Sequence, residues 1–250
     1  MLSGWRERGL AFSVAVDPDP AAASVAGPDL LVVRDFAAIP GGFAPSAVVL
    51  AVKPQNAAAT LPLYAGFAGG AVFLSIMAGR NLAGMAALLG SGAAIVRAMP
   101  NTPAAVRRGV TVGFAGPGVA AAQRALCDDL LTAIGKVAWV GNEALMDAVT
   151  AVSGSGPAYV FLLAELMQAA AIEQGIDPVL ARLLARETVA GSGALLAASV
   201  EESAALRVAV TSPGGTTQAA LEVLMQQAAW PATLSRAIAA ATARSRELAG

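Results

Sequence analysis

A glycine-rich turn at the start of a predicted helix is the segment of this sequence best suited to chemistry. Residues 209–224 read Ala-Val-Thr-Ser-Pro-Gly-Gly-Thr-Thr-Gln-Ala-Ala-Leu-Glu-Val-Leu. The two glycines let backbone amides approach a ligand, and the first turn of a helix offers unpaired N–H groups and a positive dipole end to a carboxylate or phosphate. The two threonines add hydroxyl groups. The alternative is an ordinary helix start, with Ser212 or Thr216 as the N-cap.

Two further polar segments follow predicted strands. Ala51-Val-Lys-Pro54 and Met99-Pro-Asn-Thr-Pro103 each begin where an apolar run ends. Ligands bind at the carboxyl ends of strands in open α/β sheets, which makes Lys53 and Asn101 candidate ligand contacts. Each has a structural alternative: Lys53 as a solvated side chain before a helix-starting proline, and Asn101 as part of a rigid double-proline turn.

Asp17 closes an earlier strand, in Val14-Ala-Val-Asp-Pro18. A carboxylate at this place in a nucleotide-binding sheet accepts hydrogen bonds from the adenosine ribose and repels a 2′-phosphate. The alternative is an aspartate that caps the helix after Pro18.

The residue types that are rare or absent limit the chemistry. The 250 residues include no histidine and one cysteine, Cys127. We therefore expect no Ser-His-Asp triad, no metal site and no internal disulfide. Cys127 is predicted to be a small buried side chain in a helix, and a single thiol fits a reducing, cytoplasmic location. A cofactor, hydroxyl groups and backbone amides are left to carry a reaction.

Charge and hydropathy argue against other partners. A formal net charge of −1 without a basic block argues against nucleic acid. The chain is 56% hydrophobic and can bury a large core, but charged residues such as Glu165 and Glu173 interrupt its apolar runs. We predict no membrane-spanning helix and no membrane partner. Trp5-Arg-Glu-Arg8 stands where a signal peptide would need an apolar core.

The first part of the chain alternates short β-branched runs with helical stretches, which is typical of a parallel α/β sheet. Strands are predicted over 12–16, 30–33, 48–52, 72–76, 94–97, 110–114 and 136–140. Helices are predicted over 82–89, 119–134, 157–174, 178–199, 216–226 and 232–248 from apolar spacing and from proline and glycine positions. The strand pattern therefore ends near Gly141.

The predicted fold class is α/β, with two domains. A Rossmann-like parallel-sheet domain covers residues 1–144, and an all-α domain covers residues 145–250. The helices of the second domain carry more leucine than a small bundle can hide, which indicates a partner subunit. A monomeric helical lid is the alternative.

One segment imitates a cofactor-binding turn. Gly116-Pro-Gly118-Val-Ala-Ala121 matches a loosened GxGxxA pattern between a strand and a helix, and Glu143 follows the next strand. Too few strands follow it to complete a nucleotide-binding half, and four α/β strands would precede it unexplained. We predict a surface turn.

Four segments occur in the order found in Δ1-pyrroline-5-carboxylate reductases. They are Ala51–Pro54, Arg97-Ala-Met-Pro-Asn-Thr-Pro-Ala104, Val152-Ser-Gly-Ser-Gly-Pro-Ala-Tyr159 and Val210-Thr-Ser-Pro-Gly-Gly-Thr-Thr217. From about Val48 to the C-terminus, the sequence therefore resembles this family, whose members reduce a cyclic imine to L-proline with a nicotinamide cofactor.

The resemblance implies roles for particular residues. It implies that the carboxylate of pyrroline-5-carboxylate lies on the amides of Gly214, Gly215 and Thr216, beside Ser212. It implies that the hydroxyl of Thr217 lies near the ring nitrogen, as the catalytic group. The implied NADPH or NADH site comprises Asp17, Ala51, Val52, Lys53, Pro54, Ile76, Met77, Ala78 and Asn101. The all-α domain is implied to be a dimerisation domain that forms a homodimer, with a higher oligomer such as a decamer also found in the family.

The sequence departs from the family pattern at three places. Residues 1–9 resemble the helix after the first glycine-rich turn, so the first strand and that turn are expected to be missing, through a late start codon or a truncation. The strands at Val14 and Val49 would then flank an empty slot. Met77 stands where alanine is usual, either narrowing the pocket or packing beside it. Ala209 stands where asparagine is frequent, which removes one polar contact.

Two other functions are compatible with this architecture. A related imine or β-hydroxyacid dehydrogenase would normally offer a lysine in the helical domain, whereas no lysine follows Lys136 here. A non-catalytic oligomerisation partner would not bind a nicotinamide dinucleotide.

Overall fold

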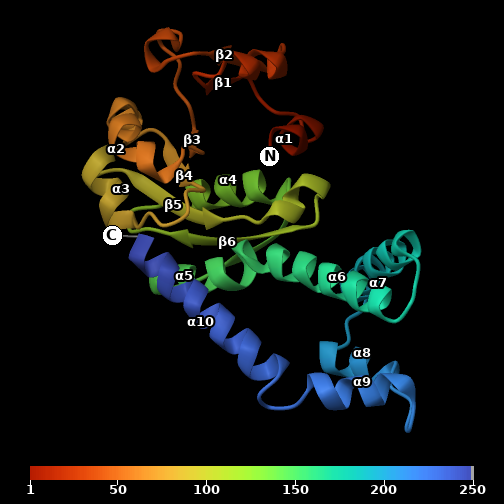
Figure 1. The fold of residues 1–250 in the computed structure, drawn as a ribbon. Helices are drawn as coiled ribbons and strands as arrows, with labels where there is room; N and C mark the ends of the chain where they lie inside the picture. The colour runs from red at the N-terminus through yellow and green to blue at the C-terminus, as the bar shows by residue number, and fades with distance from the viewer. Residues whose placement is uncertain (249–250) are drawn as a thin grey trace. The chain divides into compact units, whose positions relative to one another are not determined.

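The computed structural model describes residues 1–248, which form two compact units (Figure 1). The first unit contains residues 1–154 and the end of the chain from Ala241, and the second contains residues 155–240. The functional domains with a boundary between residues 144 and 145 remain a prediction.

The strands are β1 (Ser13–Val16), β2 (Leu30–Val33), β3 (Ala47–Leu50), β4 (Val72–Ser75), β5 (Ala94–Met99), β6 (Gly109–Ala115) and β7 (Gly135–Trp139). The α-helices are α1 (Leu2–Glu7), α2 (Ala57–Thr60), α3 (Leu82–Leu89), α4 (Ala121–Thr132), α5 (Met146–Val149), α6 (Gly156–Glu173), α7 (Pro178–Ala198), α8 (Ser203–Ala209), α9 (Thr216–Leu224) and α10 (Trp230–Leu248). Segments of 3₁₀-helix include η1 (Pro20–Val25), η2 (Phe36–Ala38), η3 (Pro54–Asn56), η4 (Leu61–Phe67), η5 (Thr102–Val106) and η6 (Glu143–Leu145), and η7 (Thr150–Gly154) is a π-helix.

The larger sheet has five strands in the order β3-β4-β5-β6-β7. β3, β4 and β5 are parallel, as predicted, and β6 is parallel to β7. β6 runs antiparallel to β5, which the sequence analysis did not predict. The physical reason is the short connection through η5, because a parallel crossover needs a dozen or more residues.

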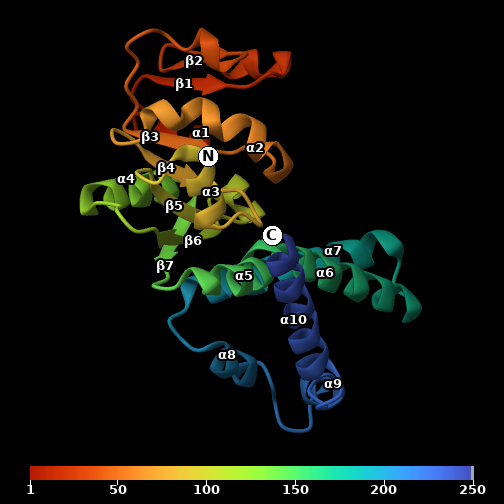
Figure 2. The same ribbon diagram turned by 90° about the vertical axis from the view of Figure 1, so that its left-hand side faces the viewer.

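β1 and β2 form a separate parallel pair (Figure 2). In the described part of the chain β1 has no partner on the side away from β2, and β3 has none on the side away from β4. The predicted interruption of the sheet between these two strands is therefore confirmed.

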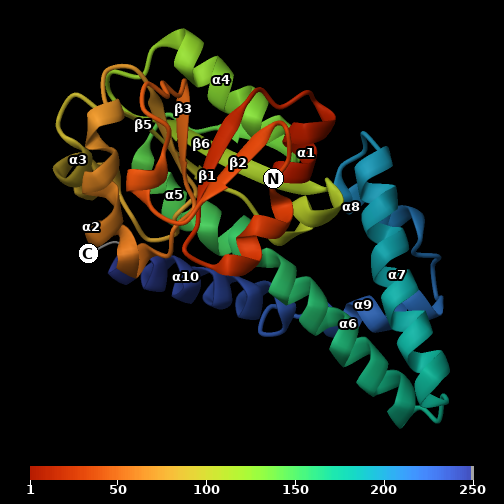
Figure 3. The ribbon, with the colours of Figure 1, turned by 90° about the horizontal axis from the view of Figure 1, so that it is seen from above.

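Helices cover both faces of the larger sheet (Figure 3). On one face, alternate residues of β4 and β5 pack against Cys127 and Leu131 of α4. On the other face, Phe73 and Ile95 pack against α2, α3 and η4, with Met85 of α3 fully buried. The inner strand β4 is buried along its whole length, as parallel strands between two helical layers usually are.

Helix α1 joins the β1–β2 pair to the larger sheet. Trp5 Nε1 donates to the Leu130 carbonyl of α4 at 2.7 Å. Arg6 donates to both carboxylate oxygens of Asp29, which precedes β2, at 2.8 and 2.9 Å. This guanidinium lowers the pKa of the Asp29 carboxyl below its usual value. Helix α1 thus contacts both the β1–β2 pair and the helical layer of the larger sheet, and so connects the two sheets.

The second unit consists of helices α6 to α9 and the first half of α10. The predicted helices are confirmed to within a few residues, whereas the short α8 was not predicted. Few of its apolar side chains are buried within the chain, among them Ala181 and Ala185 of α7. Large exposed apolar residues include Phe161, Leu162, Leu166, Leu180, Leu183, Leu184, Leu195 and Leu196. This unit has the apolar surface expected of an element that packs against another chain.

The prediction that no helix could span a membrane is wrong in one respect. The continuous helical stretch Glu143–Glu173 is long and apolar enough to do so, by length and composition alone. No charged residue lies between Asp147 and Glu165, so the interruptions on which we relied are too widely spaced. The feature is weak evidence for a membrane span, because helices that bury an apolar face against protein pass the same test.

Candidate active site

The structure brings three predicted cofactor segments together at one edge of the larger sheet. Residues 51–54 follow β3, residues 76–78 follow β4, and Asn101 follows β5. Because these three strands are parallel neighbours, their carboxyl ends share an edge. The Ile76 amide also donates to the Leu50 carbonyl at 3.1 Å, which ties the second segment to the first.

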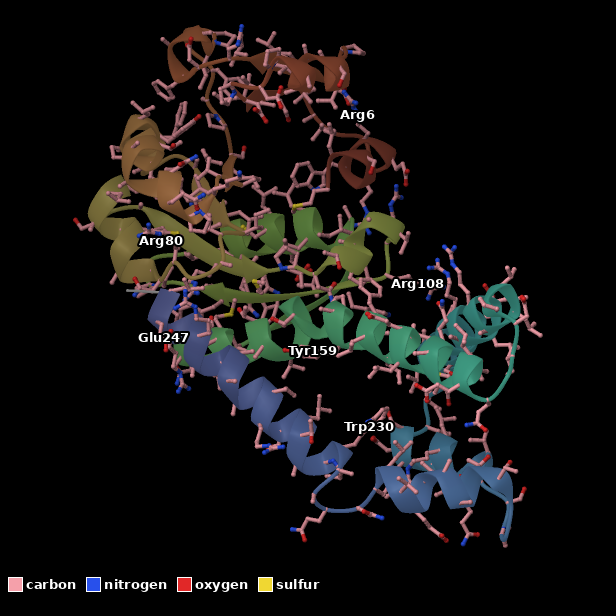
Figure 4. The ribbon with its side chains drawn as sticks, in the orientation of Figure 1. Arg6, Arg80, Arg108, Tyr159, Trp230 and Glu247 are labelled. Atoms are coloured by element: carbon pink, nitrogen blue, oxygen red, sulfur yellow. The ribbon has the colours of Figure 1, made fainter. Side chains whose placement is uncertain are left out.

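Arg80 braces the loops of this edge. Its Nε and Nη2 atoms donate to the Pro54 carbonyl at 3.2 and 2.8 Å, from the loop after β4 to the loop after β3 (Figure 4). Lys53 precedes η3 with an exposed side chain. Arg80 was not among the residues predicted for this region.

Met77 packs into the protein. Its side chain is 5% exposed and belongs to the hydrophobic core on the α3 side of the sheet. Its amide donates to Ser75 Oγ at 3.3 Å. Of the two alternatives for this residue, the structure favours packing beside the edge over narrowing of a pocket. Ile76 is half-buried and Ala78 is exposed, so these two neighbours face outward.

Asn101 holds the turn in which it lies. Its Oδ1 atom accepts from the Val110 amide at 3.0 Å, and its Nδ2 atom is 3.4 Å from Ser153 Oγ in the π-helix η7. Gly154 packs so closely on Met99 that an added Cβ would lie 2.5 Å from the Met99 methyl group. These contacts favour the structural alternative for Asn101, although one N–H of the amide is left for a ligand.

Asp17 is not the helix cap. Its Oδ1 atom accepts from the Asp19 amide at 2.9 Å, whereas Asp19 caps η1 through a 2.9 Å bond from the Ala21 amide. Asp17 therefore shapes the turn after β1 with one oxygen and exposes the rest of its carboxylate.

A buried ion pair below this edge was not predicted. Arg97 lies within β5 with a side chain only 10% exposed, and its Nη1 atom donates to Glu143 Oε1 at 2.6 Å. The same oxygen accepts from the amide of Leu82, the first residue of α3, at 2.7 Å. A charged residue inside an apolar strand is the sequence signal that could have indicated this pair.

The GxGxxA-like turn lies at the opposite edge of the sheet. It follows β6, which is antiparallel to β5, and Glu143 is engaged by Arg97. Both observations favour the predicted surface turn over a cofactor site.

The predicted substrate turn begins α9 in the second compact unit. The N-cap is Gly215 and has no side-chain partner, so neither Ser212 nor Thr216 is the N-cap. Gly214 has φ of 69°, a left-handed conformation that favours glycine. The helix starts at Thr216, and the amides of Thr216 and Thr217 lie in the first turn, where no intrahelical acceptor exists.

Two amides of the turn already have acceptors. The Gly215 amide donates to the Ser212 carbonyl at 3.0 Å, and the Gly214 amide donates to Gln218 Oε1 at 2.7 Å. Gln218 is held in turn by Glu222, whose Oε1 atom accepts from Nε2 at 3.0 Å. Gln218 was not predicted, because nothing in the sequence shows that its carboxamide folds back on the turn.

The edge after β3 and β4 fits the ring ends of a dinucleotide. Ala51 and Ala78 expose small side chains beside the half-buried Val52 and Ile76, which leaves a rim on which a flat ring can lie. The exposed ammonium of Lys53 suits a phosphate oxygen. Within residues 1–248 no glycine-rich turn leads into a helix at this edge, so these residues match the ring and ribose ends better than the diphosphate.

A cavity of about 410 Å³ lies elsewhere, between α6 and α7. It is lined by Phe161, Ala164, Glu165, Gln168, Ala169, Ile172, Arg182 and Arg186. None of the predicted site residues lines it, and its lining combines apolar side chains with polar and charged ones.

Comparisons with known proteins agree over most of the chain. Residues 143–248 match the family model described as pyrroline-5-carboxylate reductase dimerisation. A pyrroline-5-carboxylate reductase from Pseudomonas aeruginosa is 42% identical over 203 residues, covering 81% of this chain and 74% of the relative. The one from Haemophilus influenzae is 41% identical over 203 residues, covering 80% of this chain and 74% of the relative.

Solved structures agree as well. A pyrroline-5-carboxylate reductase from Coxiella burnetii superposes with a TM-score of 0.91 at 31% identity, covering 100% of this chain and 93% of that one. A Plasmodium falciparum pyrroline carboxylate reductase with NADP bound gives 0.81 at 25% identity, covering 99% of this chain and 92% of that one.

The interrupted Rossmann-like sheet and the helical dimerisation region together define a nicotinamide-dependent oxidoreductase that oligomerises. The chain belongs to the pyrroline-5-carboxylate reductase family. The reductase fold, the use of NAD(P)H and a role in proline biosynthesis follow from that membership.

Proposed function

We propose that this chain binds NADPH or NADH along the carboxyl edge of β3 to β5. Ala51, Val52, Pro54, Ile76 and Ala78 would form the rim against the nicotinamide and its ribose, with Lys53 near a phosphate. Asn101 would offer its free amide N–H, and Asp17 would face the adenosine ribose. Met77 would support the rim from the core. The shared edge of three parallel strands and the Arg80 brace support this assignment.

We further propose that the turn before α9 binds pyrroline-5-carboxylate. The substrate carboxylate would take hydrogen bonds from the amides of Gly214, Gly215 and Thr216, beside Ser212. The Gly214 amide becomes available when Gln218 rotates away, and the Gly215 amide becomes available when it releases the Ser212 carbonyl. Exposed first-turn amides and the left-handed Gly214 support this assignment, because both suit an anion.

When bound, the reduced nicotinamide supplies the hydride that reduces the C=N bond. The turn fixes the carboxylate and hence the orientation of the ring. The ring nitrogen takes up one proton from solvent as its neighbouring carbon is reduced, and the Thr217 hydroxyl donates a hydrogen bond to that nitrogen as it becomes a basic amine. Thr217 is half-buried, so this bond would be partly shielded from water.

The oligomer is proposed to be a homodimer built through α6 and α7, from which a higher assembly such as a decamer can form. The exposed leucines and the 410 Å³ cavity between these helices support a second copy as the partner. The proposed location is the cytoplasm, where the single buried thiol stays reduced.

The observation that carries the proposed activity is 42% identity to a named reductase over 203 residues. The direct test incubates the purified chain with pyrroline-5-carboxylate and NADPH or NADH, and follows proline formation together with loss of absorbance at about 340 nm, the reduced-nicotinamide band. Matched formation and loss are expected. A chain that binds neither cofactor in a fluorescence titration would instead be the non-catalytic oligomerisation partner.

A further inference from the structure

The two strands of the smaller sheet end side by side in opposite charges. Val16 of β1 pairs with Val33 of β2, so Asp17 and Arg34 are the next residues along two parallel neighbours. The Asp17 amide donates to the Val33 carbonyl at 2.9 Å, which extends the ladder one residue past the end of β1. A carboxylate and a guanidinium therefore share the edge proposed to hold the adenosine ribose.

Arg34 reaches across this edge with most of its hydrogen-bonding capacity unused. Its Nη2 atom is 3.3 Å from the Pro18 carbonyl, in the turn that Asp17 begins. The side chain is exposed and forms no ion pair with any residue in the described range 1–248. A guanidinium has five N–H donors, so a planar fork is left for an anion.

The carboxylates around Arg34 are each bonded to a backbone amide. Asp17 accepts from Asp19, Asp19 accepts from Ala21, and Asp35 accepts from Ala38, all through Oδ1 at 2.9 to 3.0 Å. These bonds hold the acids in their turns, and within residues 1–248 none of the three carboxylates forms an ion pair with Arg34. Arg34 is the single basic side chain among residues 17–19 and 33–36.

We propose that Arg34 is the contact for the 2′-phosphate of NADPH and so determines cofactor choice. The inference rests on the proposed cofactor edge. Asp17 alone would repel a 2′-phosphate, but a fork-shaped cation one strand away can bind two of its oxygens. Arg34 would thus allow the chain to use NADPH despite an acid in the usual discriminating position.

Binding can be measured without turnover. In calorimetric titrations, adenosine 2′,5′-bisphosphate is expected to bind the unmodified chain about tenfold more tightly than adenosine 5′-monophosphate, because of the charge-assisted bonds to Arg34. Arg34→Gln should abolish that difference, and Arg34→Lys should retain part of it. Arg124→Gln is the matched control, because Arg124 is exposed on α4 in the same unit, beside Trp139 at the far edge of the sheet.

Kinetics give a second readout. Arg34→Gln should lower kcat/KM for NADPH about tenfold and leave that for NADH unchanged, whereas Arg124→Gln should leave the ratio of the two unchanged. Equal losses with both cofactors, or an unchanged preference in Arg34→Gln, would overturn the assignment. A chain without reductase activity would contradict the proposed function, and the nucleotide titrations would still decide the role of Arg34.

Discussion

At the scale of single residues, the proposed site works with groups that do not titrate near neutral pH. Backbone amides and the Thr217 hydroxyl each keep one protonation state between about pH 6 and 8. The sequence contains no histidine to change charge in that range. Substrate binding by this turn should therefore depend on hydrogen-bond geometry and on competition for its amides.

Gln218 is the intramolecular competitor for the Gly214 amide. Its carboxamide oxygen occupies, at 2.7 Å, an amide assigned to the substrate carboxylate. Gln218→Ala should lower the KM for pyrroline-5-carboxylate about two- to tenfold, the value of one net hydrogen bond. Gln218→Glu should raise it, because a second carboxylate would repel the substrate. A KM that moves in the same direction in both variants, measured at saturating cofactor, would contradict this role.

Cys127 is expected to be unreactive toward alkylating reagents while the chain is folded. The side chain is fully buried between α4 and the sheet, and burial raises the pKa of its thiol to about 12. At pH 8 only about one thiol in ten thousand would be ionised, and alkylating reagents attack the thiolate. Alkylation should be very slow in buffer and fast in urea.

The thiol also links stability to alkaline pH. Unfolding returns the pKa of Cys127 to its ordinary value of about 8.5. The stability that the buried, protonated thiol contributes is therefore complete below a pH of about 8.5 and declines as the pH rises toward about 12.

Rapid alkylation of Cys127 in the native chain at pH 8 would contradict its expected lack of reactivity and would show that the α4 layer opens readily.

Residue types at strand ends were enough to indicate most of the proposed cofactor edge, but not the contacts of each side chain. Lys53 and Asp17 could be located because ligands gather at the carboxyl ends of parallel strands. Gln218 and Arg34 could not, because the first depends on one rotamer and the second on the register of β1 with β2.

At the scale of elements, side chains from neighbouring loops hold the cofactor edge in place. Arg80 joins the loops after β4 and β3, and Glu143 joins β5 to the start of α3. The loop that carries Ile76 and Ala78 lies between these two braces. Its geometry therefore depends on residues that are not expected to touch the cofactor.

Replacing Glu143 tests the contact that joins β5 to the start of α3. Glu143→Gln keeps an oxygen for the Leu82 amide but leaves the guanidinium of Arg97 buried without a counter-ion. We expect the free energy of unfolding in urea to fall by about 1–3 kcal/mol, less than for a fully buried pair because Glu143 is partly exposed.

The double variant Arg97→Met/Glu143→Gln is the control for this experiment, because it also keeps an oxygen for the Leu82 amide. It should lose less stability than Glu143→Gln, because no unpaired charge remains. Equal or greater loss in the double variant would mean that the pair itself, rather than charge compensation, stabilises these elements.

Strand positions were predictable and strand direction was not. β-Branched runs located all the observed strands to within a few residues, because such residues suit a buried pleated surface. The reversal between β5 and β6 depends on the short η5 connection, which the sequence analysis interpreted only as a turn around Asn101. The seven-residue α8 was missed because it spans less than two full turns.

At the scale of the whole molecule, the second unit depends on another chain for its apolar core. Its helices expose many large apolar side chains and bury few of their own. The leucine content of these helices predicted this dependence, and the dimerisation match agrees. The number of subunits could not be predicted, because it depends on how several such surfaces combine.

Leu183 of α7 tests the proposed homodimer. Its side chain is 55% exposed in the single chain, and Leu183→Glu would place a charge on each side of a two-fold interface. Sedimentation velocity should show a shift to monomer. Leu63→Glu is the control, because Leu63 is 52% exposed but lies in the nucleotide-binding unit. An unchanged oligomer in Leu183→Glu would remove α7 from the interface.

The most direct test of the central claim measures turnover when the Thr217 hydroxyl is removed. Thr217→Ala should lower kcat with pyrroline-5-carboxylate roughly tenfold to a hundredfold at saturating cofactor, the loss of one shielded hydrogen bond of about 1–3 kcal/mol. Thr217→Ser should retain most activity, Thr216→Ala should lose less than Thr217→Ala, and cofactor KM should not change. Equal kcat in Thr217→Ala and the unmodified chain would contradict the proposed substrate turn and leave it a plain helix start.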